Sequence, residues 1–194
     1  MKKLSFIALA IAAAAAMSST ANAASGTLQF TGNLTAASCT VTPGGDASGT
    51  GNNIVVDMGS VSFADLETAA PGNGSVGVAV TDLSFDIGCT GVGAYDTVVM
   101  NFDPQAGSGR DTSDARLLAL SPGGAAGAAI AVVDGSRNII DMSKDPEVRA
   151  ALTVNASTGA GTAKIDLAAA YLRTTGAQTP GAANGSLPFV LTYE

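Results

Sequence analysis

The hydrophobic residues of this chain fall into short segments in which apolar and polar side chains alternate, and this two-residue period most constrains the fold. In an extended segment, alternation sends the apolar side chains to one face, as in a strand with one buried side. Turn residues separate the segments. Many short alternating segments separated by turns predict an all-β fold of antiparallel strands packed as a sandwich. The clearest segments are residues 26–39, 54–58, 83–89, 98–102, 128–132, 165–171 and 187–193.

The first of these segments, residues 26–39, has no neighbour in the sequence with which it would form a hairpin. Its large apolar side chains share one face, and this row consists of Leu28, Phe30, Gly32 and Leu34. Because the nearby residues offer no partner, we expect this strand to pair with a sheet formed elsewhere. The alternative is an ordinary first strand that pairs within its own sandwich.

The N-terminus has the features of a secretory signal peptide. Lys2 and Lys3 precede an apolar run over residues 4–17, and a small-x-small cleavage site follows at residues 21–23. The apolar run is shorter than the roughly 20 residues that span a bilayer. We therefore expect residues 1–23 to be removed and the remaining chain to be exported as one soluble domain.

Two cysteines, Cys39 and Cys89, lie in the part of the chain that would be exported. An oxidising compartment favours a disulfide between them. Two free thiols or a two-ligand metal site are the alternatives. The absence of histidine makes a metal site a poor interpretation, so we expect no metal.

The composition argues against catalysis and against nucleic acid as a partner. Without histidine, neither a Ser-His-Asp nor a Cys-His arrangement can be built. Asp111 and Asp114 are candidates for a carboxylate pair, but aspartates in such loops usually form solvated turns. The glycine-rich residues 123–127 lack the Gly-Lys-Ser/Thr of a phosphate-binding loop. Because the net charge is −7, nucleic acid is also disfavoured. We expect no catalytic residue, no cofactor and no small-molecule substrate.

Local sequence signals predict several connections. Residues 42–53 have the composition of a loop. Asp-Gly at residues 134–135, between two apolar segments, predicts a hairpin turn. A bulge or turn near residues 81–82 would reconcile the alternation at residues 76–80 with the opposite parity that follows. Residues 143–152 are the one place after the signal peptide where we expect a short helical turn.

The sequence resembles the pilin subunits of chaperone–usher fimbriae, most closely the type 1 fimbrial major subunit family. The resemblance extends from residue 26 to the last residue, and its specificity lies in the ordered set of motifs together with the cysteine pair and the penultimate tyrosine. The matching motifs are GTLQFTGNLTAASCTV at residues 26–41, IVVDMG at 54–59, LSFDIGC at 83–89, AAAYL at 168–172 and ANGSLPFVLTYE at 183–194.

The resemblance implies an immunoglobulin-like sandwich that lacks its seventh strand and so leaves an apolar groove. In this family a strand of a periplasmic chaperone fills the groove first. At an outer-membrane usher, the N-terminal extension of the next subunit then replaces it, which is a case of strand addition to a sheet edge. Here the extension would be residues 24–38 and the donated row would be Leu28, Phe30, Gly32 and Leu34, with Gly32 at a point where the family requires no side chain.

The same resemblance implies that residues 39–194 form the pilin domain. Its last strand would be the edge to which the chaperone pairs, through Phe189, Leu191 and Tyr193. The Glu194 carboxylate would serve as the anchor.

The function implied is that of a structural fimbrial subunit, not an enzyme, that is exported through the periplasm to the cell surface and supports adhesion. Its partners would be identical or related pilin subunits, the periplasmic chaperone and the outer-membrane usher. A minor or adaptor subunit near the fimbrial tip is the alternative. A tip adhesin would need a separate lectin domain, for which we expect no room. Cys39 and Cys89 match the family disulfide.

Overall fold

The computed structural model describes residues 37–50, 53–70, 76–77 and 80–194. The expected signal peptide and the row from Leu28 to Leu34 lie outside the described residues, so they stay predictions. The described part consists almost entirely of strands. They are β1 (Ser38–Gly45), β2 (Ala47–Thr50), β3 (Asn53–Val56), β4 (Thr81–Thr90), β5 (Thr97–Phe102), β6 (Ala128–Asp134), β7 (Glu147–Ala151), β8 (Thr153–Asn155), β9 (Ala160–Arg173) and β10 (Phe189–Tyr193).

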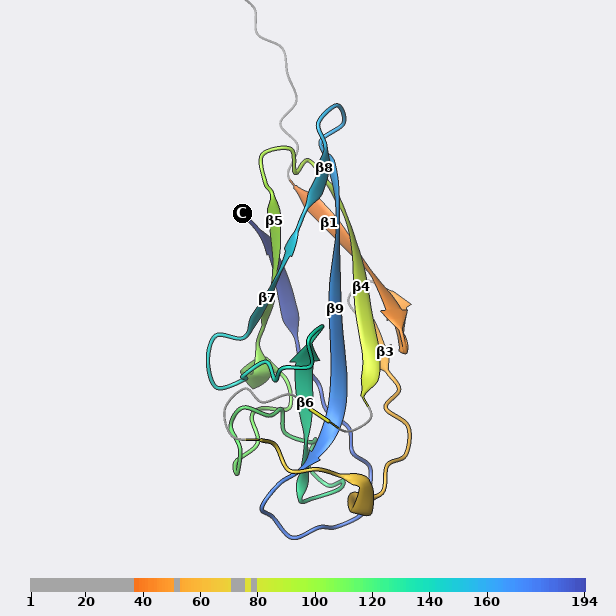
Figure 1. Cartoon of the computed structure of the whole chain (residues 1–194), viewed down its shortest axis with the longest axis vertical. Helices are drawn as coiled ribbons and strands as arrows, with labels where there is room; N and C mark the ends of the chain where they lie inside the picture. Colours follow the sequence, from red (N-terminus) through yellow and green to blue (C-terminus); the bar gives the residue numbers. More distant parts are fainter. Residues whose placement is uncertain (1–36, 51–52, 71–75, 78–79) are drawn as a thin grey trace, which may run out of the picture. The chain divides into compact units, whose positions relative to one another are not determined.

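The described strands pair in antiparallel sheets. The larger sheet has the order β1-β4-β9-β6, with β8 also paired to β9, and a second sheet has the order β10-β5-β7. The β2-β3 hairpin forms a small sheet of its own. Figure 1 shows β4 and β9 side by side in the larger sheet. The prediction of an all-β antiparallel sandwich is confirmed, and neither large sheet closes into a barrel.

The main hydrophobic core lies between the two large sheets. β4 turns Leu83, Phe85 and Ile87 inward, as the alternation predicts, and each of these side chains is at most 7% exposed. The Phe85 ring lies 6.1 Å from the ring of Phe189 on β10, so this pair joins the two sheets. Burying a side chain of this size stabilises the fold by about 1.5–3 kcal/mol.

The other face of β6 and β9 is also buried. Residues of opposite parity to the main core form a second apolar cluster there, which explains why these strands have nearly continuous apolar sequences. Four of its nine residues are alanine, and Val76, Leu117 and Ile139 reach it from the connections between strands. The cluster consists of Val76, Leu117, Ala129, Ala131, Val133, Ile139, Ala168, Ala170 and Leu172.

Two arginines fasten the connection between β3 and β4 to the rest of the domain. Arg173 donates from Nη2 to the carbonyl of Phe63 at 2.6 Å, and Arg116 donates from Nη1 to that of Ala70 at 2.8 Å. Arg116 also binds the Asp114 carboxylate at 2.6 Å, and this hydrogen bond holds the pKa of Asp114 below its ordinary value. The stabilisation from this carboxylate is therefore present at neutral pH and is lost as the pH falls through the lowered pKa.

The predicted hairpin turn after β6 is confirmed. The Asp134 carboxylate accepts hydrogen bonds from the amides of Ser136 and Asn138, and Val133 bridges to Ile139 on the return arm. Aspartate favours turns because its carboxylate can accept hydrogen bonds from the amides of the same turn, as it does here.

The predicted loop at residues 42–53 is wrong. β1 continues along β4 as far as Gly45, and the chain then forms the β2-β3 hairpin. The prediction failed because small and polar residues in this segment carry no alternating apolar signal. The partner strand β4 supplies the pairing that the local sequence does not indicate.

The predicted helical turn at residues 143–152 is also wrong. The Asp141 carboxylate caps a turn by accepting from the Ser143 amide, and residues Glu147–Ala151 then form β7 beside β5. Pairing with β5 overrides the helical propensity of this segment. The helical segments of the described residues are instead two 3-10 turns, Phe63–Asp65 and Pro104–Ala106.

The parity change near residue 81 does not arise from a bulge. Val76 belongs to the outer apolar cluster, whereas Leu83 belongs to the main core. The two sets of side chains therefore face opposite sides of the large sheet, and β4 pairs with β9 without interruption from its start at Thr81. In the described part of the chain, no helix is long and apolar enough to cross a membrane.

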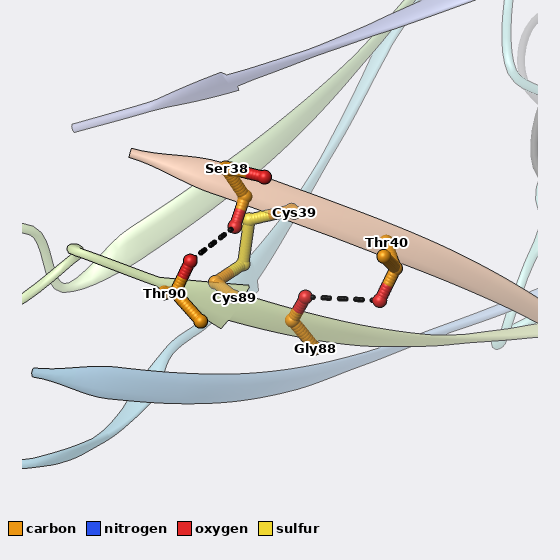
Figure 2. The surroundings of a disulfide bond; sticks show 6 residues. All are labelled: Ser38, Cys39, Thr40, Gly88, Cys89 and Thr90. Carbon is orange, nitrogen blue, oxygen red and sulfur yellow. Dashed lines mark hydrogen bonds between the residues drawn. A yellow bond between two sulfur atoms is a disulfide. The ribbon is translucent and has the colours of Figure 1, made fainter. Parts of the chain in front are cut away.

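A disulfide joins the first strand to its neighbour. Cys39 on β1 faces Cys89 on β4 in the register of the ladder, and the two residues are bonded. Figure 2 shows this bridge between hydrogen bonds from Thr40 Oγ1 to the Gly88 carbonyl and from Thr90 Oγ1 to the Ser38 carbonyl. The bridge holds the edge strand β1 on the large sheet.

Replacing both cysteines with serine, C39S/C89S, is expected to lower the free energy of unfolding by about 2–4 kcal/mol. The bridge spans 50 residues of sequence and so restricts the unfolded chain. Urea unfolding of both proteins, with and without reductant, measures the difference. Reductant should shift only the curve of the wild type, and coincident curves for the oxidised wild type and the variant would contradict the prediction.

Candidate functional site

A groove of about 1390 Å³ lies along the open edges of the two large sheets. β1, the edge strand of the larger sheet, and β10, the edge strand of the other sheet, both line it. Residues of β3 and the segment after it, up to Gly59, also contribute. The groove therefore follows the interior of the sandwich where each sheet ends.

The floor of the groove is apolar and comes from the core itself. β4, β6 and β9 each place inward-facing side chains beneath it, and each of these is at most 7% exposed. These strands face inward at every second residue, so the floor offers contacts with the spacing of an extended chain. The floor residues are Leu83, Phe85, Ile130, Val132, Leu167 and Ala169.

β10 presents unpaired main-chain groups to the groove. Thr97 and Glu194 exchange both of their backbone hydrogen bonds, at 3.0 Å each. In an antiparallel ladder such pairs alternate, so every second residue of β10 bonds to β5. The residues between them, Phe189, Leu191 and Tyr193, direct their amides and carbonyls to the other edge. No strand in the described residues pairs with that edge.

β1 presents a second open edge, which offers fewer hydrogen-bonding groups than the edge of β10. Cys39 and Cys89 have Cα atoms 4.0 Å apart, which matches a pair without backbone hydrogen bonds. Residues of the same parity as Cys39 therefore direct their main-chain groups away from β4. Val41 can donate there, but Pro43 has no amide hydrogen, so the ladder on this edge is interrupted.

One end of the groove is lined by residues 183–188, which we call the end segment. The hydroxyl of Tyr171 on β9 donates to the Ala183 carbonyl at 2.7 Å. Burial raises the pKa of this phenol, and the negative charge of Asp57, which also lines the groove, raises it further. At the other end of the segment, the Asp103 amide donates to the Pro188 carbonyl at 2.8 Å.

Glycines allow the end segment and the residues before it to approach their neighbours closely. A Cβ on Gly124 would lie 2.0 Å from the Ala182 carbonyl oxygen, and one on Gly185 would lie 2.6 Å from Cδ1 of Ile130. Only glycine fits beside the Ala182 carbonyl, whereas a side chain at position 185 would require the end of the Ile130 side chain to move. These glycines predict a loop from sequence, yet they are packing contacts in an ordered segment.

The predicted site residues at the C-terminus lie together on one rim of the groove. Phe189, Leu191 and Tyr193 are half-buried and line it, and the Tyr193 ring packs 6.0 Å from Tyr95. The carboxylate of Glu194 pairs with Arg149 on β7, an interaction that the sequence analysis did not identify. Their predicted role in chaperone binding is not tested by this geometry.

The floor residues and Tyr171 were also missed as site residues by the sequence analysis. Alternation predicts that they are buried, but it does not indicate that they line a groove. The predicted donor row, from Leu28 to Leu34, lies outside the described residues and cannot be placed in the groove. Within the described ranges, no group of three or more cysteines and carboxylates is arranged to hold a metal ion.

Comparison with known proteins identifies relatives. A family model described as fimbrial protein matches residues 28–194. The CupB6 tip adhesin from Pseudomonas aeruginosa is similar to this chain, with 28% identity and a TM-score of 0.42, over 58% of this chain and 30% of the adhesin. This chain thus spans less than a third of the length of that adhesin.

A second solved structure is an antigen and type I fimbria protein of Burkholderia pseudomallei. It shares 23% identity and a TM-score of 0.48 with this chain, over 81% of this chain and 100% of its own. A search of curated proteins found no match.

Replacing Gly124 with alanine is expected to lower the free energy of unfolding by about 1–3 kcal/mol, because the new methyl group would overlap the Ala182 carbonyl. Gly135→Ala is the matched control, since a Cβ there lies 3.6 Å from the nearest atom, the Asp166 carbonyl oxygen. Urea unfolding of the two variants measures the effect. Equal stability of the two variants would mean that the contact between Gly124 and Ala182 is loose enough to accept a methyl group.

Proposed function

Because this chain belongs to the fimbrial protein family, we propose that it is a structural subunit of a cell-surface fimbria and that it polymerises by donor-strand exchange. Residues 24–38 of one copy are the donor strand, and the groove of the next copy is the acceptor. The observation that carries the proposal is the apolar groove bordered by open strand edges. Strand addition to such an edge is a known mode of peptide recognition.

The donor strand has the side chains that the groove requires. Leu28, Phe30 and Leu34 would meet the apolar floor, and burying them contributes about 1.5–3 kcal/mol each, or roughly 5–9 kcal/mol together. Gly32, the remaining member of the row, would lie where the family requires no side chain. Association costs reduce this gain, so apolar burial alone supports only modest affinity.

Main-chain hydrogen bonds supply the remaining affinity in this proposal. The edge of β10 offers the amides and carbonyls of Phe189, Leu191 and Tyr193, and β1 offers a partial ladder that Pro43 interrupts. A strand between the two edges would pair on both sides. Pairing would remove the exposed main-chain groups that make an open edge prone to aggregation.

Before assembly, a periplasmic chaperone would fill the same groove. Its strand would pair with the edge of β10, and the Glu194 carboxylate would be its anchor. The outer-membrane usher would be the place where the donor strand of the next subunit replaces the chaperone. The open edges support this part of the proposal, because a subunit with an empty groove leaves the main-chain groups of the edge without a partner strand.

Deletion of residues 24–35 is expected to stop polymerisation while leaving chaperone binding intact, because the deletion removes the donor strand and keeps the groove. Cells that produce the variant with its chaperone and usher are examined by electron microscopy, and chaperone complexes are counted after purification from the periplasm. Fimbriae built from the truncated subunit would contradict the donor assignment.

A synthetic peptide of residues 24–38 is expected to stabilise the deletion variant, because it would restore the missing strand. At a peptide concentration 100-fold above Kd, the gain in free energy of unfolding is about 2.7 kcal/mol. Thermal unfolding with and without peptide measures it. A control peptide with serine in place of Leu28, Phe30 and Leu34 should give no shift, and an equal shift from both peptides would contradict the role of the apolar row.

A further inference from the structure

The end segment crosses from one large sheet to the other. At Pro188 it is bonded to Asp103, which directly follows β5 of the smaller of these sheets. At Ala183 it is bonded to Tyr171 on β9 of the larger sheet. The segment lines the groove between these two points, so it closes that end of the groove. Figure 1 shows the blue connection between β9 and β10 passing around the lower ends of these sheets.

The end segment is held along its length and not only at its ends. The Ser108 amide donates to the Ser186 carbonyl at 2.9 Å, and the Ser121 amide donates to the Asn184 carbonyl at 2.7 Å. The Ser108 hydroxyl also accepts from the Ser186 amide at 3.2 Å. These bonds use main-chain groups of the segment at alternate residues, so the segment is an anchored wall.

The wall lies directly on the floor of the groove. Gly185 has no side chain, and a Cβ in its place would lie 2.6 Å from Cδ1 of Ile130, one of the floor residues. At Gly185, therefore, no side chain of the end segment separates its backbone from the floor. A strand that lies along the floor must therefore end where it meets the segment.

We propose that Tyr171 and the end segment form a fixed stop that sets the register of the strand in the groove. This inference rests on the proposed function, in which that strand is residues 24–38 of a second copy. Tyr171 is a positioning residue: its hydroxyl ties the wall to β9, opposite Ile130 in the ladder. The stop matters because a shift of two residues preserves the alternation of the strand but moves one apolar side chain out of the groove.

The test uses the full chain, refolded with a large excess of synthetic peptide so that the peptide occupies the groove. One peptide is residues 24–38, and two others carry two extra alternating residues at the N-terminus or at the C-terminus. Peptide affinity is measured by native mass spectrometry and thermal shift. We expect extension at one terminus only to weaken binding at least tenfold, because the strand must then withdraw an apolar side chain from the groove.

Two tyrosine variants separate the stop from general effects on the fold. Tyr171→Phe keeps the ring and removes the bond to Ala183, whereas Tyr95→Phe changes a partly exposed tyrosine that does not line the groove. In Tyr171→Phe, the penalty for the extended peptide should fall severalfold. The Ser121 amide, which donates to the end segment, and the Ser186 amide within it should exchange hydrogen faster. Tyr95→Phe should match the wild type in both measurements.

Equal binding of both extended peptides by the wild type would overturn the stop while leaving the proposed function in place. If the extended peptide loses as much affinity in Tyr171→Phe as in the wild type, Tyr171 is not part of the stop. If the peptide of residues 24–38 itself does not bind, the proposed function fails and the stop fails with it.

Discussion

The structure depends on an apolar core that two sheets share but do not fully enclose, because their facing edges are open. The core needs the inward side chains of both sheets, and the Phe85 and Phe189 pair shows that they meet. Along β1 and β10, however, the core reaches the surface as a groove with main-chain groups that have no partner in the described residues. Water can form hydrogen bonds with these main-chain groups, but its contact with the apolar floor is unfavourable. The same feature is therefore a weakness of the isolated domain and the basis of its proposed assembly.

The two rims of the groove are built differently. β1 is bonded covalently to β4 through Cys39 and Cys89, but Pro43 interrupts the hydrogen-bonding capacity of its free edge. β10 has no disulfide, yet its edge is complete, and the Arg149 pair with Glu194 ties its end to β7. A strand entering the groove could therefore form only an interrupted ladder with β1, which the disulfide holds in place. With β10 it could form a full ladder.

Glycine-rich connections contribute to the site as structure. The residues between β9 and β10 look like a flexible loop in sequence, but backbone bonds fasten them to the connection between β5 and β6. Gly124 is required by a backbone contact closer than any side chain permits, and Gly185 lies against the end of the Ile130 side chain. Composition alone cannot distinguish this use of glycine from a mobile linker, because both need a residue without a side chain.

The sequence by itself determined the strands with strong alternation, the turn at Asp134, the pairing of Cys39 with Cys89 and the orientation of Phe189, Leu191 and Tyr193, because each depends on local geometry or on a unique partner. Only the tertiary structure decided that β7 is a strand, that β2 and β3 form a hairpin, and which floor residues lie under the groove. These depend on which distant strands become neighbours, and the energy of that pairing is absent from any local pattern. The groove itself belongs to this second group, because it is a relation between two edges that are far apart in the chain.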